Sequence, residues 1–302
     1  MIETTANDNL RQAPAGSMIA PPLRQRVGHG SLAPAPVFAI TSGKGGVGKT
    51  NVVANLATAL ARKKKRVLVI DADLGLANLD LFLGVRPVHT LEDFFAGTVG
   101  LSEVIIANRD GVLLLPGASG VQALTALSTE QKIALLTELD VMTQEVDLVL
   151  IDTGSGISDA VTYFITAAQE IVVVATAEPS SITDAYALIK VLTSDHRQKR
   201  FSILANNVVD GAEAMRLFET LSGAALRFLN ASLDFLGWIP RDPQLLRAVA
   251  QARTVVSMAA DAPSSRAFFA LADQFADSAQ RIKVKGNVQF FFRRLLEAEK
   301  NA

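Results

Sequence analysis

The chain has 302 residues, with 29 Lys or Arg against 30 Asp or Glu, so its formal net charge is only −1 and no global positive field favours nucleic acid. It contains no cysteine, which excludes disulfides, thiol catalysis, iron–sulfur clusters and Cys-ligated zinc. No 18-residue apolar run suggests a membrane span, and the polar start Met1–Leu10 does not resemble a signal peptide. We therefore expect a cytoplasmic protein.

The first 35 residues differ in composition from the rest of the chain. They contain Pro14, Pro21, Pro22 and Pro34, several glycines and no sustained hydrophobic periodicity. Such a composition is typical of a flexible segment. The predicted organisation is a flexible N-terminal extension over residues 1–35 followed by a main domain over 36–285.

From Val37 onward, short apolar runs alternate with segments of helical periodicity. The expected strands are 37–40, 66–71, 112–115, 147–152, 171–175, 201–205 and 233–239. The expected helices are 51–62, 128–142, 158–168, 181–193, 211–221, 242–251 and 263–281. Near-continuous apolar strands separated by helices predict an α/β fold of three layers, α/β/α, with a mainly parallel central sheet.

The stretch Gly43-Lys-Gly-Gly-Val-Gly-Lys-Thr50 fits the phosphate-binding pattern G-x-x-x-x-G-K-[ST], between a predicted strand and a predicted helix. Glycines let backbone N–H groups turn toward an anion, and the helix N-terminus adds partial positive charge. The lysine that ends the pattern can reach the β- and γ-phosphates, and the following hydroxyl can bind Mg²⁺. The predicted nucleotide-binding residues here are Gly45, Gly46, Val47, Gly48, Lys49, Thr50 and Asn51.

Three acids stand where such a site needs them. Asp152 ends one apolar strand, and Asp71 and Asp73 end another, so all three belong at the carboxyl edge of a parallel sheet. Asp152 is expected to hold Mg²⁺ through water. Of the other two, one can hold the metal's water shell and one can orient the attacking water, with helix capping as the alternative. Gly154 and Gly156 suggest a mobile loop that senses the γ-phosphate.

Lys44 is a second lysine inside the phosphate loop, which the general pattern does not require. It is either an exposed loop charge or a catalytic cation that acts in cis or in trans, as an arginine finger does.

Three stretches together resemble the MinD/ParA family of ATPases, which carry a deviant Walker A motif. They are the phosphate loop with Lys44, Asp71–Asp80 and Asp152–Gly156. The resemblance covers residues 36–302. It implies ATP and Mg²⁺ as ligands, and an ATP-sandwiched homodimer in which Lys44 reaches the partner's nucleotide. It further implies catalytic roles for Lys44, Lys49 and Asp73, with metal binding by Thr50, Asp71 and Asp152. Base contacts are implied for Asn206 and for the segment Pro240-Arg-Asp242.

Within that family, the likeness is strongest to the FlhG (FleN) group of regulators of flagellar number. This likeness rests on three features: the long N-terminal extension, the sequence of Asp152–Ile157 and the stretch Phe291–Leu296. The implied partners are the flagellar GTPase FlhF and flagellar basal-body or regulatory proteins. Of the N-terminal motif by which the group stimulates FlhF, only Leu10 and Arg11 match.

The end of the chain, residues 286–302, is predicted to be an amphipathic helix. Its apolar stripe at helical spacing is Val288, Phe291, Phe292, Leu295 and Leu296, flanked by arginines and a lysine. Such a helix either docks on its own domain or lies in an anionic lipid surface. The resemblance favours membrane targeting, on the inner face of the cell membrane, with dimerisation doubling the anchor.

The basic run Arg62–Arg66 follows the first helix, where cations complement the helix dipole. A non-specific DNA patch is the alternative interpretation. The predicted function is an ATP-hydrolysing switch that dimerises on the membrane and regulates the number or placement of flagella. The alternatives are a MinD-type regulator of the division site and a ParA-type partition ATPase on DNA. DNA is not an expected partner, and the lack of cysteine argues against a metal-cluster carrier.

Overall fold

The computed structural model describes residues 18–19, 35–73, 78–117, 138 and 145–281. Four predicted features lie wholly or largely outside these residues: the flexible N-terminal extension at 1–35, most of the helix at 128–142, part of the stretch that follows Asp73, and the C-terminal helix at 286–302 with its five apolar positions. They stay predictions.

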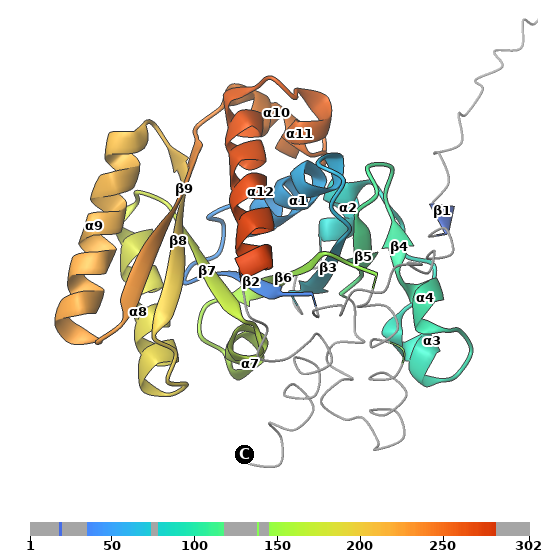
Figure 1. Cartoon of the computed structure of the whole chain (residues 1–302), viewed down its shortest axis with the longest axis horizontal. Coiled ribbons are helices and arrows are strands. Elements are labelled where there is room, and N and C mark those ends of the chain that lie inside the picture. Colours follow the sequence, from blue (N-terminus) through green and yellow to red (C-terminus); the bar gives the residue numbers. More distant parts are fainter. Residues whose placement is uncertain (1–17, 20–34, 74–77, 118–137, 139–144, 282–302) are drawn as a thin grey trace, which may run out of the picture.

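A nine-stranded sheet forms the centre of the described molecule, in the order β1-β4-β5-β3-β6-β2-β7-β8-β9 (Figure 1). Pairing is parallel from β5 through to β9, whereas β4 is antiparallel to β5 and β1 is antiparallel to β4. This confirms the mainly parallel sheet. The strands are β1 Met18–Ile19, β2 Val37–Ser42, β3 Val67–Ala72, β4 Ile106–Ala107, β5 Leu113–Leu115, β6 Leu148–Ser155, β7 Glu170–Ala175, β8 Arg200–Val208 and β9 Ser232–Pro240.

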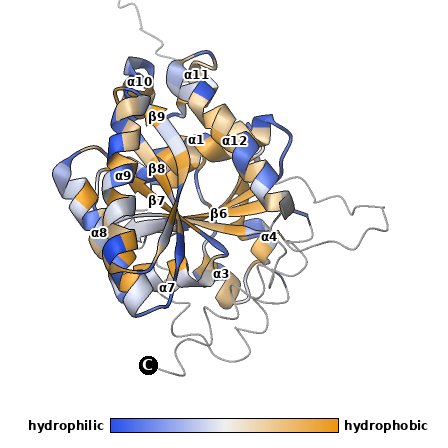
Figure 2. Ribbon diagram, turned by 60° about the vertical axis from the view of Figure 1, so that its left-hand side comes forward, coloured by the Kyte–Doolittle hydropathy of each residue, from blue (hydrophilic) through white to orange (hydrophobic). Residues whose placement is uncertain are grey.

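Helices cover both faces of the sheet, which confirms the three layers (Figure 2). One face carries α1 Lys49–Arg62, α2 Leu79–Leu83, α10 Pro243–Ala250, α11 Val255–Met258 and α12 Pro263–Arg281. The other carries α3 Leu91–Phe95, α4 Leu101–Val104, α7 Asp159–Ala167, α8 Pro179–Ser194 and α9 Gly211–Phe228.

Alternation along the strands explains why both faces are apolar. Within β6, Leu148 and Leu150 pack toward α1, whereas Val149 and Ile151 pack into the opposite cluster, and all four are fully buried. A strand in the middle of a parallel sheet is covered on both sides, so its sequence is apolar at every position. That continuous apolar run is the signal that predicted these strands.

The strand order reverses beside β2. From β2 the chain passes through α1 to β3 on one side of β6, and after β6 it continues through α7 to β7 on the other side of β2. In such sheets the ligand crevice lies beyond the carboxyl ends of the strands at the point of reversal. The loop that leaves β2 is the glycine-rich loop, so the topology places it at that crevice.

In the basic run that ends and follows α1, three cations are paired with acids from distant elements. Arg62 meets Asp110, Lys63 meets Asp273 and Arg66 meets Asp147. Arg62 lies in the last turn of α1, as the interpretation as a helix-dipole cap requires, and the ion pairs are additional contacts. The acids are 48 to 210 residues away in sequence, so local spacing carried no sign of them.

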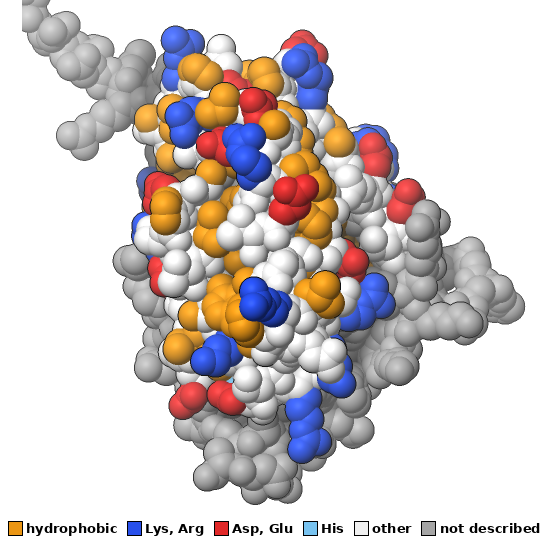
Figure 3. All heavy atoms as spheres, turned by 90° about the vertical axis from the view of Figure 1, so that its left-hand side faces the viewer, with side chains coloured by type: hydrophobic (Ala, Val, Ile, Leu, Met, Phe, Trp, Pro, Cys, Tyr) orange, Lys and Arg blue, Asp and Glu red, His pale blue; other side chains and the backbone are white. Residues whose placement is uncertain are grey.

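The sheet ends at β9, beside α9. Apolar, basic and acidic side chains mix on the face that shows this end of the molecule, and no continuous basic area covers its described part (Figure 3). Met215, Leu226 and Phe228 of α9 are exposed there. Among the described residues, no helix is long and apolar enough to cross a membrane.

Candidate functional site

A pocket of about 620 Å³ opens at the carboxyl edge of the sheet, around the loop between β2 and α1. All seven predicted residues from Gly45 to Asn51 line it, together with Lys44. The predicted phosphate loop is therefore an actual concave site. Its other lining residues are Ser42, Asp73, Asn78, Phe82, Ser155, Thr176, Glu178, Asn206, Asn207, Leu245, Leu246 and Val249.

The loop requires glycine at position 48. Gly48 has a φ of 88°, and a Cβ there would come within 2.6 Å of the Asn206 amide nitrogen. Any side chain would be strained by the left-handed backbone and would also displace Asn206. With glycine, the loop turns directly into α1, whose first N–H groups face the pocket as an anion site.

Lys49 lies almost buried between two carboxylates. Its ammonium donates to Oδ1 of Asp152 at 2.9 Å and lies 3.9 Å from Oδ2 of Asp73. Burial raises the pKa of Asp152, against the opposing effects of the Lys49 charge and the Thr50 hydroxyl. The second oxygen of Asp152, Oδ2, is buried without a hydrogen-bond partner in the described residues. A buried carboxylate oxygen of this kind suits water bound to a hard cation.

Asp71 is set back from the pocket. Its carboxylate accepts from the backbone N–H groups of Asp73 at 3.2 Å and Leu79 at 3.4 Å, and it does not line the cavity. Burial, and then the charge of Asp152, raise the pKa of Asp71 from 3.8 to about 7. The structure therefore shows Asp71 holding the backbone around Asp73, whereas its metal role stays a prediction.

Lys44 stands at the rim of the pocket and is paired within its own chain. Its ammonium donates to Oε2 of Glu178 at 3.0 Å and to Oγ of Ser180 at 2.9 Å, both at the start of α8. The side chain is 37% exposed, so the pair lies in a wet environment where it is weak. Lys44 is thus a held but accessible cation, and its predicted reach into a partner's site is untested.

Asn206, at the end of β8, lies next to the loop as predicted. Its Nδ2 donates to the carbonyl oxygen of Val47 at 2.7 Å, which leaves Oδ1 buried without a hydrogen-bond partner among the described residues. That oxygen is an acceptor of the kind that an exocyclic amino group would satisfy. The hydroxyl of Thr176 and the Nδ2 of Asn51, both in the lining, are likewise buried without partners there. Nothing in the sequence around Thr176 predicted that it would line the pocket.

The segment Pro240–Asp242 is not part of the pocket lining. Asp242 caps α10 by accepting from the N–H of Gln244, and it also accepts from the N–H and hydroxyl of Ser264. Although burial acts in the opposite direction, these hydrogen bonds hold the pKa of Asp242 below its usual value. The structure gives Asp242 a capping role, and the base contacts of Pro240 and Asp242 stay predictions.

The apolar wall of the pocket comes from the helix that follows. Leu245, Leu246 and Val249 of α10 line the cavity, and Phe82 of α2 joins them. Leu246 is 62% exposed, although an apolar side chain normally avoids water. The apolar spacing in 242–251 predicted the helix, but its outward face gave no sign of the pocket.

The stretch after Asp152 is more ordered than predicted. Gly154 and Ser155 belong to β6, Ser155 is paired with Ser42 of β2, and the N–H of Gly156 donates to the carbonyl oxygen of Ser42. The predicted mobile loop is therefore wrong for Gly154 and Ser155, because pairing with β2 extends the strand. Ser155 still lines the pocket.

The donors and acceptors of this pocket fit a nucleoside triphosphate with Mg²⁺. Loop N–H groups and Lys49 suit phosphate oxygens, and the apolar wall with Asn206 suits a base. Thr50 in the lining suits the cation's coordination shell, and so does the free oxygen of Asp152, which lies next to Lys49 behind the lining.

Comparisons with known proteins agree with this site. The model of the ParA family, described as "NUBPL iron-transfer P-loop NTPase", matches residues 35–276. The antiactivator FleN of Pseudomonas aeruginosa is 42% identical over 89% of this chain and 96% of its own, and the flagellum site-determining protein YlxH of Helicobacter pylori is 34% identical over 86% and 89%. The solved septum site-determining protein MinD of Pyrococcus horikoshii, complexed with Mg-ADP, has a TM-score of 0.62 at 27% identity and covers 83% of this chain and 100% of its own. With the family model matching most of its length, the chain belongs to the ParA/MinD family of P-loop NTPases.

Proposed function

We propose that this chain is an ATP-hydrolysing switch that forms an ATP-bound homodimer on the membrane and regulates the number or placement of flagella. The observation that carries the proposal is Lys44, a second loop cation held at the rim of an otherwise complete phosphate site. The similarity to FleN and YlxH along almost the whole chain supports the flagellar process.

Different residues of the pocket are proposed to bind the phosphates, hold Mg²⁺ and orient the attacking water. Loop N–H groups and Lys49 bind and orient the phosphates, and Thr50 and Asp152 hold Mg²⁺, which neutralises charge as the terminal phosphate departs. Lys49 is already oriented, because Asp152 and Asp73 hold its ammonium in place. Asp73 lines the pocket on this side and is proposed to orient the attacking water.

The base site discriminates by the fixed direction of an amide. Val47 accepts from the Asn206 nitrogen, so the acceptor of this amide without a partner among the described residues is its oxygen. An adenine amino group donates to it, whereas a guanine carbonyl in the same place meets a second acceptor. We therefore propose ATP rather than GTP as the substrate.

Lys44 is proposed to leave Glu178 and Ser180 and reach the nucleotide of the partner when two copies meet face to face. A weak, exposed ion pair makes that release inexpensive. The predicted helix at 286–302 then attaches the dimer to lipid, since two weak anchors bind far more tightly than one. FlhF and flagellar basal-body or regulatory proteins are the proposed partners.

The other functions are less well supported. A ParA-type role on DNA is disfavoured, because three cations of the basic run are paired with acids. Iron transfer, the activity named in the description of the matching family, is disfavoured because the chain contains no cysteine and so lacks the usual thiolate ligands. A division-site role would use the same ATPase chemistry, so only the phenotype of a deletion strain distinguishes it from the flagellar role.

The test is microscopy of a deletion strain, with flagella and minicells counted in the same cells. Extra, missing or misplaced flagella with normal division are expected, and complementation with the wild-type gene should restore the normal pattern. Minicells with normal flagella would contradict the flagellar proposal in favour of a division-site role.

A matched pair of lysine variants tests the ATPase. Lys49→Ala should abolish ATP hydrolysis and fail to complement, whereas Lys63→Ala, which removes a cation of the same helix far from the loop, should behave as wild type. Equal activity of the two variants would contradict the site.

A further inference from the structure

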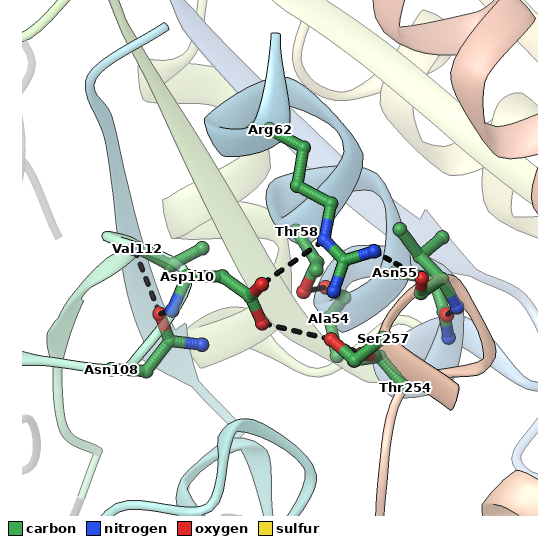
Figure 4. Close-up of polar contacts among 10 residues, drawn as sticks. Ala54, Asn55, Thr58, Arg62, Asn108, Asp110, Val112, Thr254 and Ser257 are labelled. Carbon is green, nitrogen blue, oxygen red and sulfur yellow. Dashed lines mark hydrogen bonds and ion pairs between the residues drawn. The ribbon is translucent and has the colours of Figure 1, made fainter. Parts of the chain in front are cut away.

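A polar cluster on the flank of α1 ties three elements that are distant in sequence. The guanidinium of Arg62 donates through Nε to Oδ1 of Asp110 at 3.0 Å and through Nη1 to the carbonyl oxygen of Val256 at 2.7 Å. The hydroxyl of Ser257 donates to the other oxygen of Asp110 at 2.8 Å. Figure 4 shows Arg62, Asp110 and Ser257 converging from α1, the β4–β5 turn and α11. We call these three residues the clamp.

The acid of the clamp is itself held in position. Asp110 lies in the turn between β4 and β5, where Oδ1 of Asn108 accepts from the N–H groups of Asp110 at 3.0 Å and Val112 at 2.9 Å (Figure 4). Asn108 is buried, so the turn cannot rotate freely and the carboxylate faces Arg62 and Ser257. The clamp therefore fixes α11 to a rigid turn of the sheet.

A second connection joins α11 to the pocket. The side chain of Asn55 is fully buried; its Nδ2 donates to the carbonyl oxygen of Asn51 at 2.8 Å, and its Oδ1 accepts from the N–H of Val256 at 3.2 Å. Asn51 belongs to the first turn of α1 and lines the pocket. Thus α11 is fixed relative to the phosphate loop as well as to the β4–β5 turn.

These connections matter because α11 directly follows α10, which supplies the apolar wall of the pocket. The N–H of Arg253 in the short link donates to the carbonyl oxygen of Ala248 in α10. The start of α10 is held separately, through Asp242 and Ser264. With both ends fixed, α10 keeps Leu246 and Val249 at the mouth of the cavity, half exposed and available to a ligand.

We propose that the clamp is a positioning device for the nucleotide base: Asp110 and Ser257, which do not line the pocket, set the place of the α10 wall through α11. This rests on the proposed function, since it assumes that the pocket binds a nucleotide. In the described residues, the hydrogen bonds that hold Lys44, Val47 and Lys49 come from elements other than α10. Loosening the clamp therefore weakens the base-dependent part of the affinity and leaves the triphosphate-dependent part intact.

The experiment compares the Kd for Mg-ATP with the Kd for Mg-bound inorganic triphosphate by calorimetry on the full chain. Asp110→Ala should weaken ATP binding by about fivefold while triphosphate binding stays within about twofold. Ser257→Ala, a milder change that keeps the ion pair, should weaken ATP binding by about twofold. The matched control is Asp273→Ala, which breaks the neighbouring Lys63 pair to α12 and should leave both constants unchanged.

A general loss of structure would weaken both ligands together, so the ratio of the two constants separates positioning from stability. If Asp110→Ala does not fold, Ser257→Ala carries the test alone. An unchanged ratio in the folded clamp variants, or the same change in Asp273→Ala, would overturn the inference. Failure of the wild-type protein to bind either ligand would instead overturn the proposed function.

Discussion

At the scale of single residues, the site depends on how far each charge is from water. Lys49 and Asp152 are almost fully buried as a pair, whereas Lys44 and Glu178 form a pair that solvent reaches. A buried pair is hard to break without leaving a charge unpaired, while an exposed pair exchanges easily. The same loop thus carries one fixed lysine for the bound phosphates and one that can change partners.

The Lys44 pair predicts a separation between stability and assembly. Lys44→Ala should leave the free energy of unfolding within about 0.5 kcal/mol of wild type, because the pair is exposed. It should retain ATP binding but lose ATP-driven dimerisation. Urea unfolding, calorimetry and sedimentation of the same sample check this. A Lys44→Ala protein that still dimerises with ATP would contradict the proposed reach into the partner's site.

Asp71 predicts a dependence of stability on pH. Its folded pKa of about 7 lies above the ordinary value of 3.8, so the folded state binds the proton more tightly than the unfolded state. The stability contributed by the protonated form is complete below about pH 4 and is lost as the pH rises through about 7. In the nucleotide-free and metal-free protein, Asp71→Asn removes this loss.

The free energy of unfolding of Asp71→Asn relative to wild type should therefore increase between pH 4 and pH 7, by up to about 4 kcal/mol. Denaturant titrations of both proteins at pH 4 and pH 7 measure the difference. A constant difference across this range would show that Asp71 is ionised in the folded protein throughout.

At the scale of elements, continuous apolar runs were sufficient to predict the central strands and most of the long helices. They failed for elements too short to show a period, such as β4 with two residues and α11 with four. The predicted helix at 211–221 ends too early, because α9 continues to Phe228 and buried Leu221 and Ala225 lie on its packed face.

The candidate site shows the same limit. The phosphate loop is one continuous stretch, so its residues could be predicted in full. Thr176 and Leu246 reach the pocket from separate elements through the sheet order and the placement of α10. Asp242 was predicted to approach the base, yet its partner is Ser264 of α12, which only the tertiary structure brings near.

Two aspartates that cap helices provide a test of that assignment. Asp242 caps α10 and also holds Ser264 in the core, whereas Asp210 caps α9 through the N–H of Glu213 alone. Asp210→Ala should lower the free energy of unfolding by about 1 kcal/mol, and Asp242→Ala by about 2 to 3 kcal/mol. Chemical denaturation measures both. Equal losses would show that the Ser264 contacts add nothing.

At the scale of the whole molecule, the sheet order and the two helical layers bring residues from three strands, three helices and the loops after β3 and β7 to one edge. The phosphate loop, Asn206 and the α10 wall meet there, with Asp152 buried behind Lys49, and the pocket remains open beside Lys44. An open rim with an available cation suits closure by a second copy of the chain. We therefore predict that nucleotide controls the oligomeric state.

Analytical ultracentrifugation of Asp73→Ala tests this claim most directly, because the substitution should block hydrolysis and preserve the bound ATP. With Mg-ATP the protein should sediment with twice the monomer mass, and with Mg-ADP as a monomer. Calorimetry on the same sample establishes that ATP is bound. A protein that binds ATP and keeps the monomer mass would contradict the account of an ATP-driven switch.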